Sequence, residues 1–155
     1  MSDAAKLQLL ADKEEIRQIF TDYARYLDAY DYAGYASLFS KEGNFGGSIG
    51  VEAITAQMAA YVERVTTAKE EGRFKDAVHL MSNPHIEIDG DTAKADITWC
   101  YMTRDRDEVP TVFQMGHYLD DLVREDGKWK ILKHTVNRSM GRAQLEPPHP
   151  SRLDA

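Results

Sequence analysis

A histidine and an amide, His79 and Asn83, stand four residues apart in the stretch Val78–Asn83, which has the composition of a short strand. Side chains alternate between the two faces of a strand, so positions 79, 81 and 83 share one face. Histidine is the one side chain that titrates near neutrality when unperturbed, which suits it to carry a proton. We therefore treat His79 as a candidate general base and Asn83 as a candidate substrate ligand.

A carboxylate that could hold this histidine lies upstream, where Asp28 ends an amphipathic segment. A carboxylate is unfavourable near the negative C-terminal end of a helix, so its presence there favours a functional role. A carboxylate bonded to one imidazole nitrogen fixes the tautomer and leaves the other nitrogen free to accept a proton. General-base assistance of this kind is worth roughly 10²–10⁴-fold in rate. The alternative is that Asp28 is a helix-terminal side chain facing water.

The alternation along residues 78–88 argues against this pairing, because the apolar residues occupy the even positions: Val78, Leu80, Ile86 and Ile88. His79 and Asn83 then share the opposite face with polar residues. Two arrangements would still bring His79 inside. Pro84 could mark a bulge that changes the phase midway, or the sheet could be buried on both faces near its start. The sequence leaves both open.

Other candidate site residues lie on the first helix and the later strands. Tyr23 and Tyr30 flank Asp28 and could bind substrate, with Tyr23 donating to a carbonyl or serving as a buried structural tyrosine. His117 lies among Phe113, Met115 and Leu119 at alternating positions, as a second pocket acid or base or as a packed core histidine. On the last strand, His134, Asn137 and Arg138 could line the mouth of a cavity.

Composition excludes several classes of partner. The chain has 155 residues, with 26 acidic against 19 basic side chains and a formal charge of −7. Nucleic-acid binders present a basic face, so we expect no nucleic-acid partner. No apolar run approaches the eighteen or so residues of a spanning helix, and the polar amino terminus lacks the apolar core of a signal peptide. We expect a cytoplasmic protein with no membrane partner.

Metal and cofactor chemistry is not indicated by the pattern. Cys100 is the single cysteine, so a disulfide within the chain and a cysteine-based zinc site are excluded. The histidines are scattered, without a pair four apart on a helix beside a carboxylate. The Gly46–Gly50 run lacks the lysine and the preceding strand of a phosphate-binding loop. We therefore expect chemistry without a metal or cofactor, and the high tyrosine content suits a small hydrophobic, ring-shaped ligand.

Helical periodicity occupies the first half of the chain and alternation the second. Residues 1–6 are expected to be disordered, followed by a helix to near Tyr30, with Asp12 as N-cap and Glu15 as its capping-box partner. Its apolar stripe comprises Ile16, Ile19, Phe20, Tyr23 and Leu27. We predict a short helix with Tyr35, Leu38 and Phe39 facing inward, a strand or turn near Asn44–Phe45, and a helix from Val51 to Ala68. The predicted strands are Val78–Ile88, Ala93–Thr103, Val109–Arg124 and Trp129–Asn137, separated by turns at 89–91 and 125–127.

Helices followed by an antiparallel meander are typical of an α+β domain. We expect a cone-shaped curved antiparallel sheet wrapped around the long N-terminal helix, with a cavity open at one end. A single domain should span residues 7–140, preceded by the disordered N-terminus and followed by a Pro-rich tail over 141–155.

The sequence resembles the SnoaL-like branch of the nuclear transport factor 2-like superfamily over roughly residues 7 to 140. The resemblance rests on Asp28-x-x-Asp31-Tyr32, on Leu38-Phe39, on His79-x-x-x-Asn83 and on the Asp126–Ile131 turn into the last strand. The first and third motifs resemble in spacing those of the scytalone dehydratases and hexachlorocyclohexane dehydrochlorinases. The resemblance implies that His79 removes a proton from the substrate while Asp28 orients it. Asn83 matches only the dehydrochlorinases.

We therefore expect a cofactor-independent lyase or isomerase that acts on a small hydrophobic cyclic substrate. A dehydratase, a dehydrohalogenase and a polyketide cyclase share the first step, so the sequence does not choose between them. The alternatives are a non-catalytic module that binds a small ligand or oligomerises, and an accessory subunit of a ring-hydroxylating dioxygenase. The resemblance also implies a homo-oligomer, with a trimer preferred to a dimer.

Overall fold

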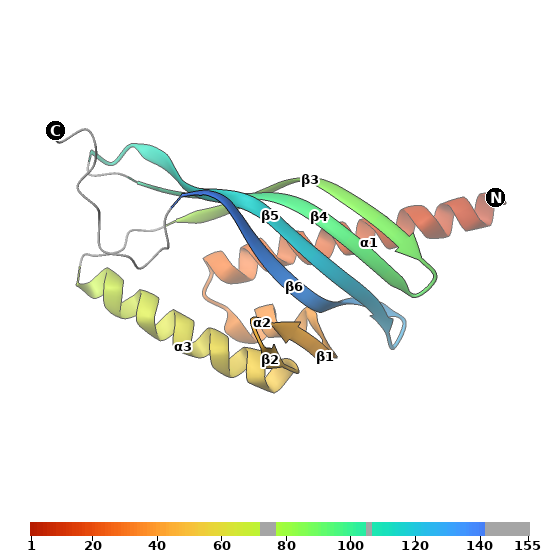
Figure 1. The fold of residues 1–155 in the computed structure, drawn as a ribbon, viewed down its shortest axis with the longest axis horizontal. Helices are drawn as coiled ribbons and strands as arrows, with labels where there is room; N and C mark the ends of the chain where they lie inside the picture. The colour runs from red at the N-terminus through yellow and green to blue at the C-terminus, as the bar shows by residue number, and fades with distance from the viewer. Residues whose placement is uncertain (72–76, 105–106, 142–155) are drawn as a thin grey trace.

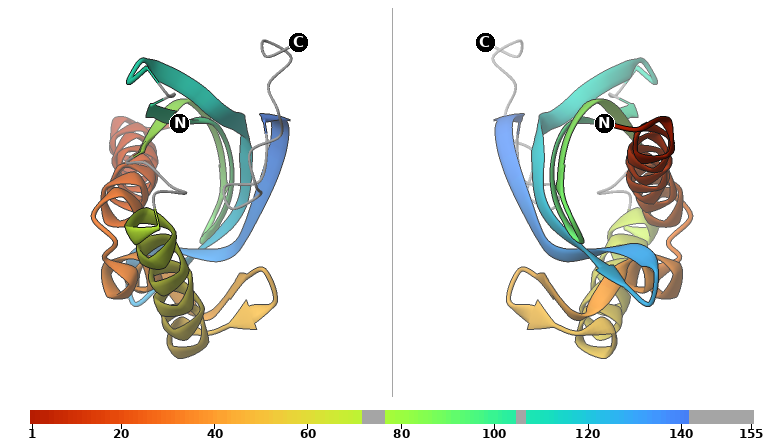
Figure 2. Two further views of the ribbon diagram at one scale, coloured as in Figure 1. Left: turned by 90° about the vertical axis from the view of Figure 1, so that its left-hand side faces the viewer. Right: turned by 90° about the vertical axis from the view of Figure 1, so that its right-hand side faces the viewer.

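A long helix, α1 (Asp3–Asp28), lies along the concave side of a curved six-stranded sheet (Figures 1 and 2). The structure is a computed structural model, and it describes residues 1–71, 77–104 and 107–141. A short helix, α2 (Tyr32–Ser37), and a longer one, α3 (Val51–Glu70), follow α1. The molecule therefore has helices on the concave side of an unclosed sheet, as predicted for this α+β fold.

The strands are β1 (Phe39–Phe45), β2 (Ser48–Ile49), β3 (Val78–Asp89), β4 (Thr92–Arg104), β5 (Pro110–Glu125) and β6 (Lys128–Gly141). Their order in the sheet is β2-β1-β6-β5-β4-β3. Strands β3 to β6 form the predicted antiparallel meander, and β1 joins β6 as a parallel neighbour. The hairpin of β1 and β2 thus extends the sheet on the side away from β3, which is the opposite edge.

The start of α1 corrects two predictions. The helix begins at Asp3, and Ser2 is its N-cap, because the Ser2 hydroxyl accepts from the backbone N–H of Ala5 at 3.2 Å. Residues 3–6 are therefore helical. Asp12 lies inside the helix, where its carboxylate pairs with Arg124 at 2.8 Å. Glu15 accepts from the backbone N–H of Trp129 on β6 rather than closing a capping box.

Short helix α2 ends earlier than its apolar residues suggest. Asp31 caps its N-terminus by accepting from the backbone N–H of Gly34 at 2.8 Å, and the helix stops at Ser37. Tyr35 and Phe39 are both buried as predicted, but Phe39 is the first residue of β1 rather than part of the helix. Its ring centroid lies 5.5 Å from that of Tyr35. Helix α3 occupies the predicted segment.

Irregular pairing bends the sheet around α1. The register shifts between Ser82 and His85 in β3, and again between Met115 and Gly116 in β5. A Cβ atom added at Gly116 would lie 1.9 Å from the backbone oxygen of Asn137 on β6, so only glycine permits this close approach. Such bulges increase the local twist and bend of a sheet, which produces the hollow side that faces the helices in Figure 2.

The hydrophobic core fills the space between the helices and the concave face. It combines the α1 stripe with inward side chains of α3 and of the central strands, including Ile54, Met58, Ile97, Leu122, Trp129 and Ile131. Among the described helices, none has the length and apolar character needed to cross a membrane. Of the Pro-rich tail predicted over 141–155, Gly141 is the last residue of β6, and residues 142–155 lie outside the described residues.

Candidate active site

Two elements bring the predicted pair together. Asp28 is the last residue of α1, and His79 is the second residue of β3, the edge strand that packs against α1. The bulge between Ser82 and His85 changes the phase of β3, so His79 faces inward while Val78 and Leu80 are 49% and 52% exposed. Beyond the bulge, Ile86 is buried. Of the two arrangements that the alternation left open, the bulge is confirmed.

Asp28 holds His79 by its ring and by its backbone. The His79 Nδ1 lies 2.7 Å from the Asp28 Oδ1, and the His79 backbone N–H donates to the same carboxylate at 3.1 and 3.2 Å. The side chains are 12% and 28% exposed, so the imidazole is the more enclosed of the two. The ring of Tyr101 packs against the imidazole with 4.6 Å between centroids. The imidazole is therefore held at its Nδ1 edge by Asp28 and contacted by the ring of Tyr101.

The His79 side chain lines a cavity of about 210 Å³ on the concave side of the sheet. Aromatic rings dominate its wall: Tyr23, Tyr35, Phe45, Tyr61, Trp99, Tyr101 and Tyr118. Asp28 does not line this cavity. It lies instead in a second hollow, a groove between α1 and β3 that His79 also borders. The imidazole therefore stands between its carboxylate partner and the aromatic cavity.

A second histidine–aspartate pair lies in the interior behind Tyr23. The His134 Nδ1 is 2.6 Å from the Asp120 Oδ1, and both side chains are fully buried. The His134 Nε2 is 3.0 Å from the hydroxyl oxygen of Tyr23. Burial raises the pKa of Asp120, although the neighbouring His134 acts in the opposite direction. Burial also raises the pKa of Tyr23 well above its usual value. His134 is thus part of a hydrogen-bonded chain rather than of the cavity mouth.

Two polar groups in the cavity wall could not be predicted from the sequence. The indole Nε1 of Trp99 and the side-chain Oε1 of Gln57 are buried without a hydrogen-bond partner among the described residues. Buried polar atoms of native proteins are normally paired. One buried donor and one buried acceptor in residues of the cavity wall are therefore unpaired. The alternation along β4 predicts that Trp99 points inward, but nothing in the sequence shows that its indole N–H is unpaired.

His117 is a correction. Its side chain is about half exposed on the outer face of the sheet, where it pairs with Asp96 at 2.7 Å. The prediction that the odd-numbered residues of this strand point inward is wrong beyond Phe113, because the pairing of β5 with β4 skips this residue. This irregularity shifts the phase, so Gln114, Tyr118 and Asp120 are the buried residues.

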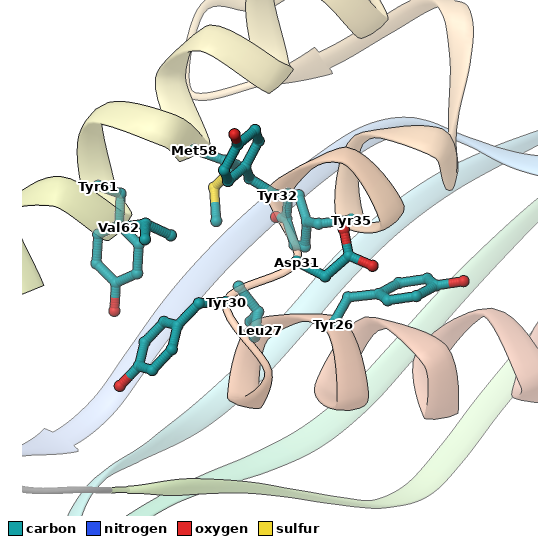
Figure 3. Close-up of a pocket in the computed structure, with 9 residues that line it drawn as sticks. All are labelled: Tyr26, Leu27, Tyr30, Asp31, Tyr32, Tyr35, Met58, Tyr61 and Val62. Atoms are coloured by element: carbon teal, nitrogen blue, oxygen red, sulfur yellow. The ribbon is translucent and has the colours of Figure 1, made fainter. Parts of the chain in front are cut away.

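Tyr30 does not reach the cavity of His79. It lies in a separate crevice between the C-terminal end of α1, the short helix α2 and the middle of α3, shown in Figure 3. There Lys69 donates to its hydroxyl at 3.3 Å. On β6, Val136 lines the cavity, whereas Asn137 and Arg138, predicted for the mouth, are exposed and do not. The prediction for Asn83 falls on a side chain outside the described part of the structure.

Within the described residues, no group of three or more histidine, cysteine, aspartate or glutamate side chains is arranged to hold a metal ion. The ionisable groups of the site occur as pairs, each with one imidazole and one carboxylate. Such a pair can move a proton, which is the chemistry that this geometry supports.

Comparison with known proteins places the chain in a family. The sequence profile of the SnoaL-like domain matches residues 8–135. The chain belongs to the SnoaL-like family. This SnoaL-like chain is 23% identical over 133 residues to the protein Rv2910c of Mycobacterium tuberculosis, a match that spans 83% of this chain and 86% of the relative.

Two of the solved structures with a similar fold come from Novosphingobium aromaticivorans. A nuclear transport factor 2-like protein with a cystatin-like fold superposes with a TM-score of 0.71 at 22% identity, covering 84% of each chain. A candidate scytalone dehydratase superposes with a TM-score of 0.65 at 22% identity, covering 91% of this SnoaL-like chain and 93% of the other. At these identities the likeness establishes the nuclear transport factor 2-like fold.

Proposed function

We propose that this SnoaL-like protein is a cofactor-independent lyase or isomerase in which His79 removes a proton from a small hydrophobic cyclic substrate. One observation supports the proposal above the others. An imidazole held by a carboxylate at 2.7 Å forms part of the wall of an aromatic cavity. Neither an isolated histidine nor an exposed pair would supply both the orientation and the enclosed space.

The hydrogen bonds of Asp28 define the protonation state that the reaction needs. An aspartate carboxylate only accepts hydrogen bonds, so the His79 Nδ1 that lies beside it carries the hydrogen. In the neutral imidazole the other nitrogen, Nε2, then holds a lone pair and can accept a proton. When it does so, the ring becomes an imidazolium, which the neighbouring carboxylate stabilises.

The elimination that we propose balances without an outside oxidant or reductant. The Nε2 of His79 takes a proton from a carbon next to an activating group, and the C–H electron pair moves into the substrate. That pair then expels a leaving group from the neighbouring carbon. When the leaving group is a hydroxide, it takes the proton from the imidazolium and departs as water, which returns His79 to its neutral state. If the proton is instead returned to another carbon, the reaction is an isomerisation.

Cavity size and lining limit the substrate. A free volume of about 210 Å³ lies below the range of about 300–1,000 Å³ typical of sites for drug-sized ligands, so the substrate is small. The aromatic wall favours a ring-shaped apolar body. Trp99 and Gln57 contribute an unpaired donor and an unpaired acceptor to the same wall, and these atoms would orient a ring that carries polar atoms once a side-chain shift exposes them.

A panel of three substrate classes tests the proposal. Cyclic β-hydroxy ketones report dehydration, cyclic chlorinated hydrocarbons report loss of HCl, and cyclic β,γ-unsaturated ketones report isomerisation. We expect turnover in at least one class, and in deuterated water we expect exchange of the proton next to the activating group. Both signals should be lost in His79→Gln and kept in the matched surface variant His117→Gln. Retained turnover in His79→Gln would refute the assignment of the base.

The same panel addresses the non-catalytic alternative. A binding module would take up members of the panel with measurable affinity, yet neither turnover nor deuterium exchange would exceed the rate in buffer. Binding is measured by the quenching of fluorescence from Trp99, which lines the cavity, with Trp129, in the core, as the second indole of the chain. Binding without exchange in the wild-type protein would therefore replace the enzymatic proposal.

A further inference from the structure

Arg64 brings a positive charge to the cavity of His79, and the proposed reaction does not use it. Among the described residues that line this cavity, Arg64 alone carries a fixed charge, and no aspartate or glutamate shares the wall. Gln57, Tyr61 and Arg64 are spaced by four and three residues along α3, so one face of this helix borders the cavity. The Arg64 side chain is also exposed, which places it where the cavity meets solvent.

The guanidinium of Arg64 has no partner in the part of the chain that the structure describes. Arg17, Arg104 and Arg124 each pair with a carboxylate, whereas Arg64 makes no such contact and no hydrogen bond. A guanidinium presents its donors in a planar fork that matches the geometry of a carboxylate. The chain as a whole has a formal charge of −7 and repels anions, so an anionic ligand needs a local cation. Arg64 can supply that cation.

Gln114 adds a buried polar group to the same wall. This residue is only 7% exposed and lines the cavity, yet its side-chain amide forms no hydrogen bond within the described residues. The amide atoms of Gln114 are not completely sealed, in contrast to the Trp99 Nε1 and the Gln57 Oε1. Buried polar groups of native proteins are normally paired. A ligand in the cavity would provide the partner that this amide lacks.

Strand pairing relates Gln114 to the proposed base. His79 on β3 lies opposite Tyr101 on β4, and Tyr101 lies opposite Gln114 on β5. Neighbouring strands are about 4.7–4.9 Å apart, so the backbones of His79 and Gln114 are separated by roughly 10 Å. The C-terminal half of α3, which carries Arg64, lies toward the same end of the molecule as the starts of β3 and β5 (Figure 1). One ring in the cavity can therefore reach His79 on one side and Gln114 on the other.

We propose that the substrate carries a carboxylate, which Arg64 binds where the cavity meets solvent while the Gln114 amide donates to it from the wall. This inference rests on the proposed function and names its substrate class: a hydrophobic ring with one acidic substituent. A carboxylate has one negative charge and two oxygens, which match one guanidinium and one amide. A phosphate dianion would leave a charge uncompensated, because the described lining residues include no second fixed cation.

The two residues determine specificity, and His79 keeps the chemistry. The carboxylate is already charged before the proton is removed, so Arg64 and Gln114 bind it equally in the ground state and in the transition state. Loss of such uniform binding raises KM and leaves kcat unchanged. We therefore expect Arg64→Gln to raise KM for an acidic substrate, whereas His79→Gln abolishes turnover.

Binding of three probes to the whole chain tests the charge independently of turnover. Benzoate carries a carboxylate, benzamide is its neutral counterpart, and phenyl phosphate is a dianion near neutral pH. Isothermal titration calorimetry should show that the wild-type protein binds benzoate tightest. Arg64→Gln should lose roughly tenfold in benzoate affinity, with little change for benzamide. Absent benzoate binding, equal affinity for benzoate and benzamide, tighter binding of phenyl phosphate, or no loss in Arg64→Gln would each overturn the inference.

Two further variants separate a specific site from a general effect of net charge. Arg138→Gln removes an exposed arginine of β6 that does not line the cavity, so it should bind benzoate as the wild type does. Arg64→Lys keeps the charge and should retain part of the preference for benzoate. Added salt should weaken benzoate binding in the wild type and not in Arg64→Gln, because salt screens an exposed charge. Equal losses in Arg64→Gln and Arg138→Gln would contradict the proposal.

A spectroscopic measurement on the wild-type protein tests Gln114 without replacing a buried residue. The side-chain N–H signals of Gln114 in nitrogen-15 spectra should shift when benzoate is added to saturation, since the amide gains a hydrogen-bond acceptor. Benzoate bound by Arg64 alone would leave these signals where they are. That result would overturn the role assigned to Gln114.

The two proposals fail separately. His79→Gln should keep the preference for benzoate, because the charge of Arg64 remains, and loss of that preference would assign the anion to the imidazole instead. If His79→Gln retains turnover, the base is misassigned while the benzoate site stands. If a ring substrate is turned over and an added carboxylate does not lower its KM, the proposed reaction stands and the carboxylate inference is overturned.

Discussion

Three pairs in the described residues join a histidine Nδ1 to an aspartate oxygen at 2.6 or 2.7 Å, yet their surroundings differ. His79–Asp28 is partly enclosed, His134–Asp120 is fully buried, and His117–Asp96 is about half exposed on the outer face. Each contact has the same geometry within 0.1 Å. What separates them is the neighbour of the other ring nitrogen and the access of water.

The comparison shows that distance alone does not identify a catalytic pair. The His134 Nε2 is already committed to Tyr23, so this histidine cannot act on a substrate directly. His117 is about half exposed to solvent, where an ion pair contributes little to stability. His79 alone combines an oriented ring with a cavity wall. A buried pair whose second ring nitrogen is already hydrogen-bonded can only hold another side chain in place. An exposed pair lacks an enclosed space for a substrate.

The largest effect should come from His79. The variant His79→Gln keeps a polar side chain of similar length but has no basic nitrogen, so turnover should fall by roughly 10²–10⁴-fold. Activity on the best substrate of the panel measures this, and circular dichroism checks that the fold is intact. An unchanged rate would mean that the comparison has selected the wrong pair.

Asp120→Ala should be the most destabilising change among the three aspartates. It leaves the buried His134 without its partner, which costs about 3–5 kcal/mol of the free energy of unfolding. Urea denaturation compares it with Asp96→Ala, for which the cost should stay within about 1 kcal/mol because the exposed pair is screened by water. Equal losses of the free energy of unfolding in Asp120→Ala and Asp96→Ala would show that burial does not determine how much each pair contributes to stability.

Asp28→Asn should reduce activity less than loss of the histidine. The amide can still hydrogen-bond to the ring but no longer stabilises the imidazolium, so we expect a loss on the order of 10²-fold in kcat. KM should change little, since Asp28 does not line the cavity. A large rise in KM at constant kcat would instead make Asp28 part of the binding surface.

Asp12 provides a contrast on the same helix as Asp28, because its partner is an arginine. Burial would raise the pKa of Asp12, but hydrogen bonds from Arg124 and Gln8 outweigh it and lower the pKa below its ordinary value of 3.8. The stabilisation is therefore present above 3.8 and is lost as the pH falls through the lowered pKa. Asp12→Asn should cost about 1–3 kcal/mol at pH 7. The difference in the free energy of unfolding between Asp12→Asn and the wild type should disappear at a pH below the lowered pKa of Asp12. Urea denaturation at pH 7 and at that acidic pH measures this difference.

The smallest effect is expected at the surface pair. His117→Gln should leave turnover unchanged and alter the free energy of unfolding by less than about 1 kcal/mol. Kinetics and urea denaturation on the same preparation measure both quantities. A marked loss of activity would show that the outer face of the sheet contributes to the site.

The sequence by itself determined the class of fold, because helix periodicity and strand alternation act over short distances. The stripe of α1, the position of α3 and the four strands of the meander followed from it, whereas the choice of His79 and Asp28 rested on their chemical types and on the family resemblance. The α1 start was misplaced because Asp12 and Glu15 have the spacing of a cap. Their carboxylates are taken by Arg124 and by the backbone of Trp129, contacts that only a folded chain provides.

Only the tertiary structure decided which faces of the strands point inward. A single irregularity at Ser82–His85 turns His79 to the concave side, and another at Phe113 turns His117 out and Asp120 in. A bulge inserts one residue and reverses every side chain beyond it. For this reason the union of Tyr23, His134 and Asp120, from three separate elements, could not be read from the order of the residues.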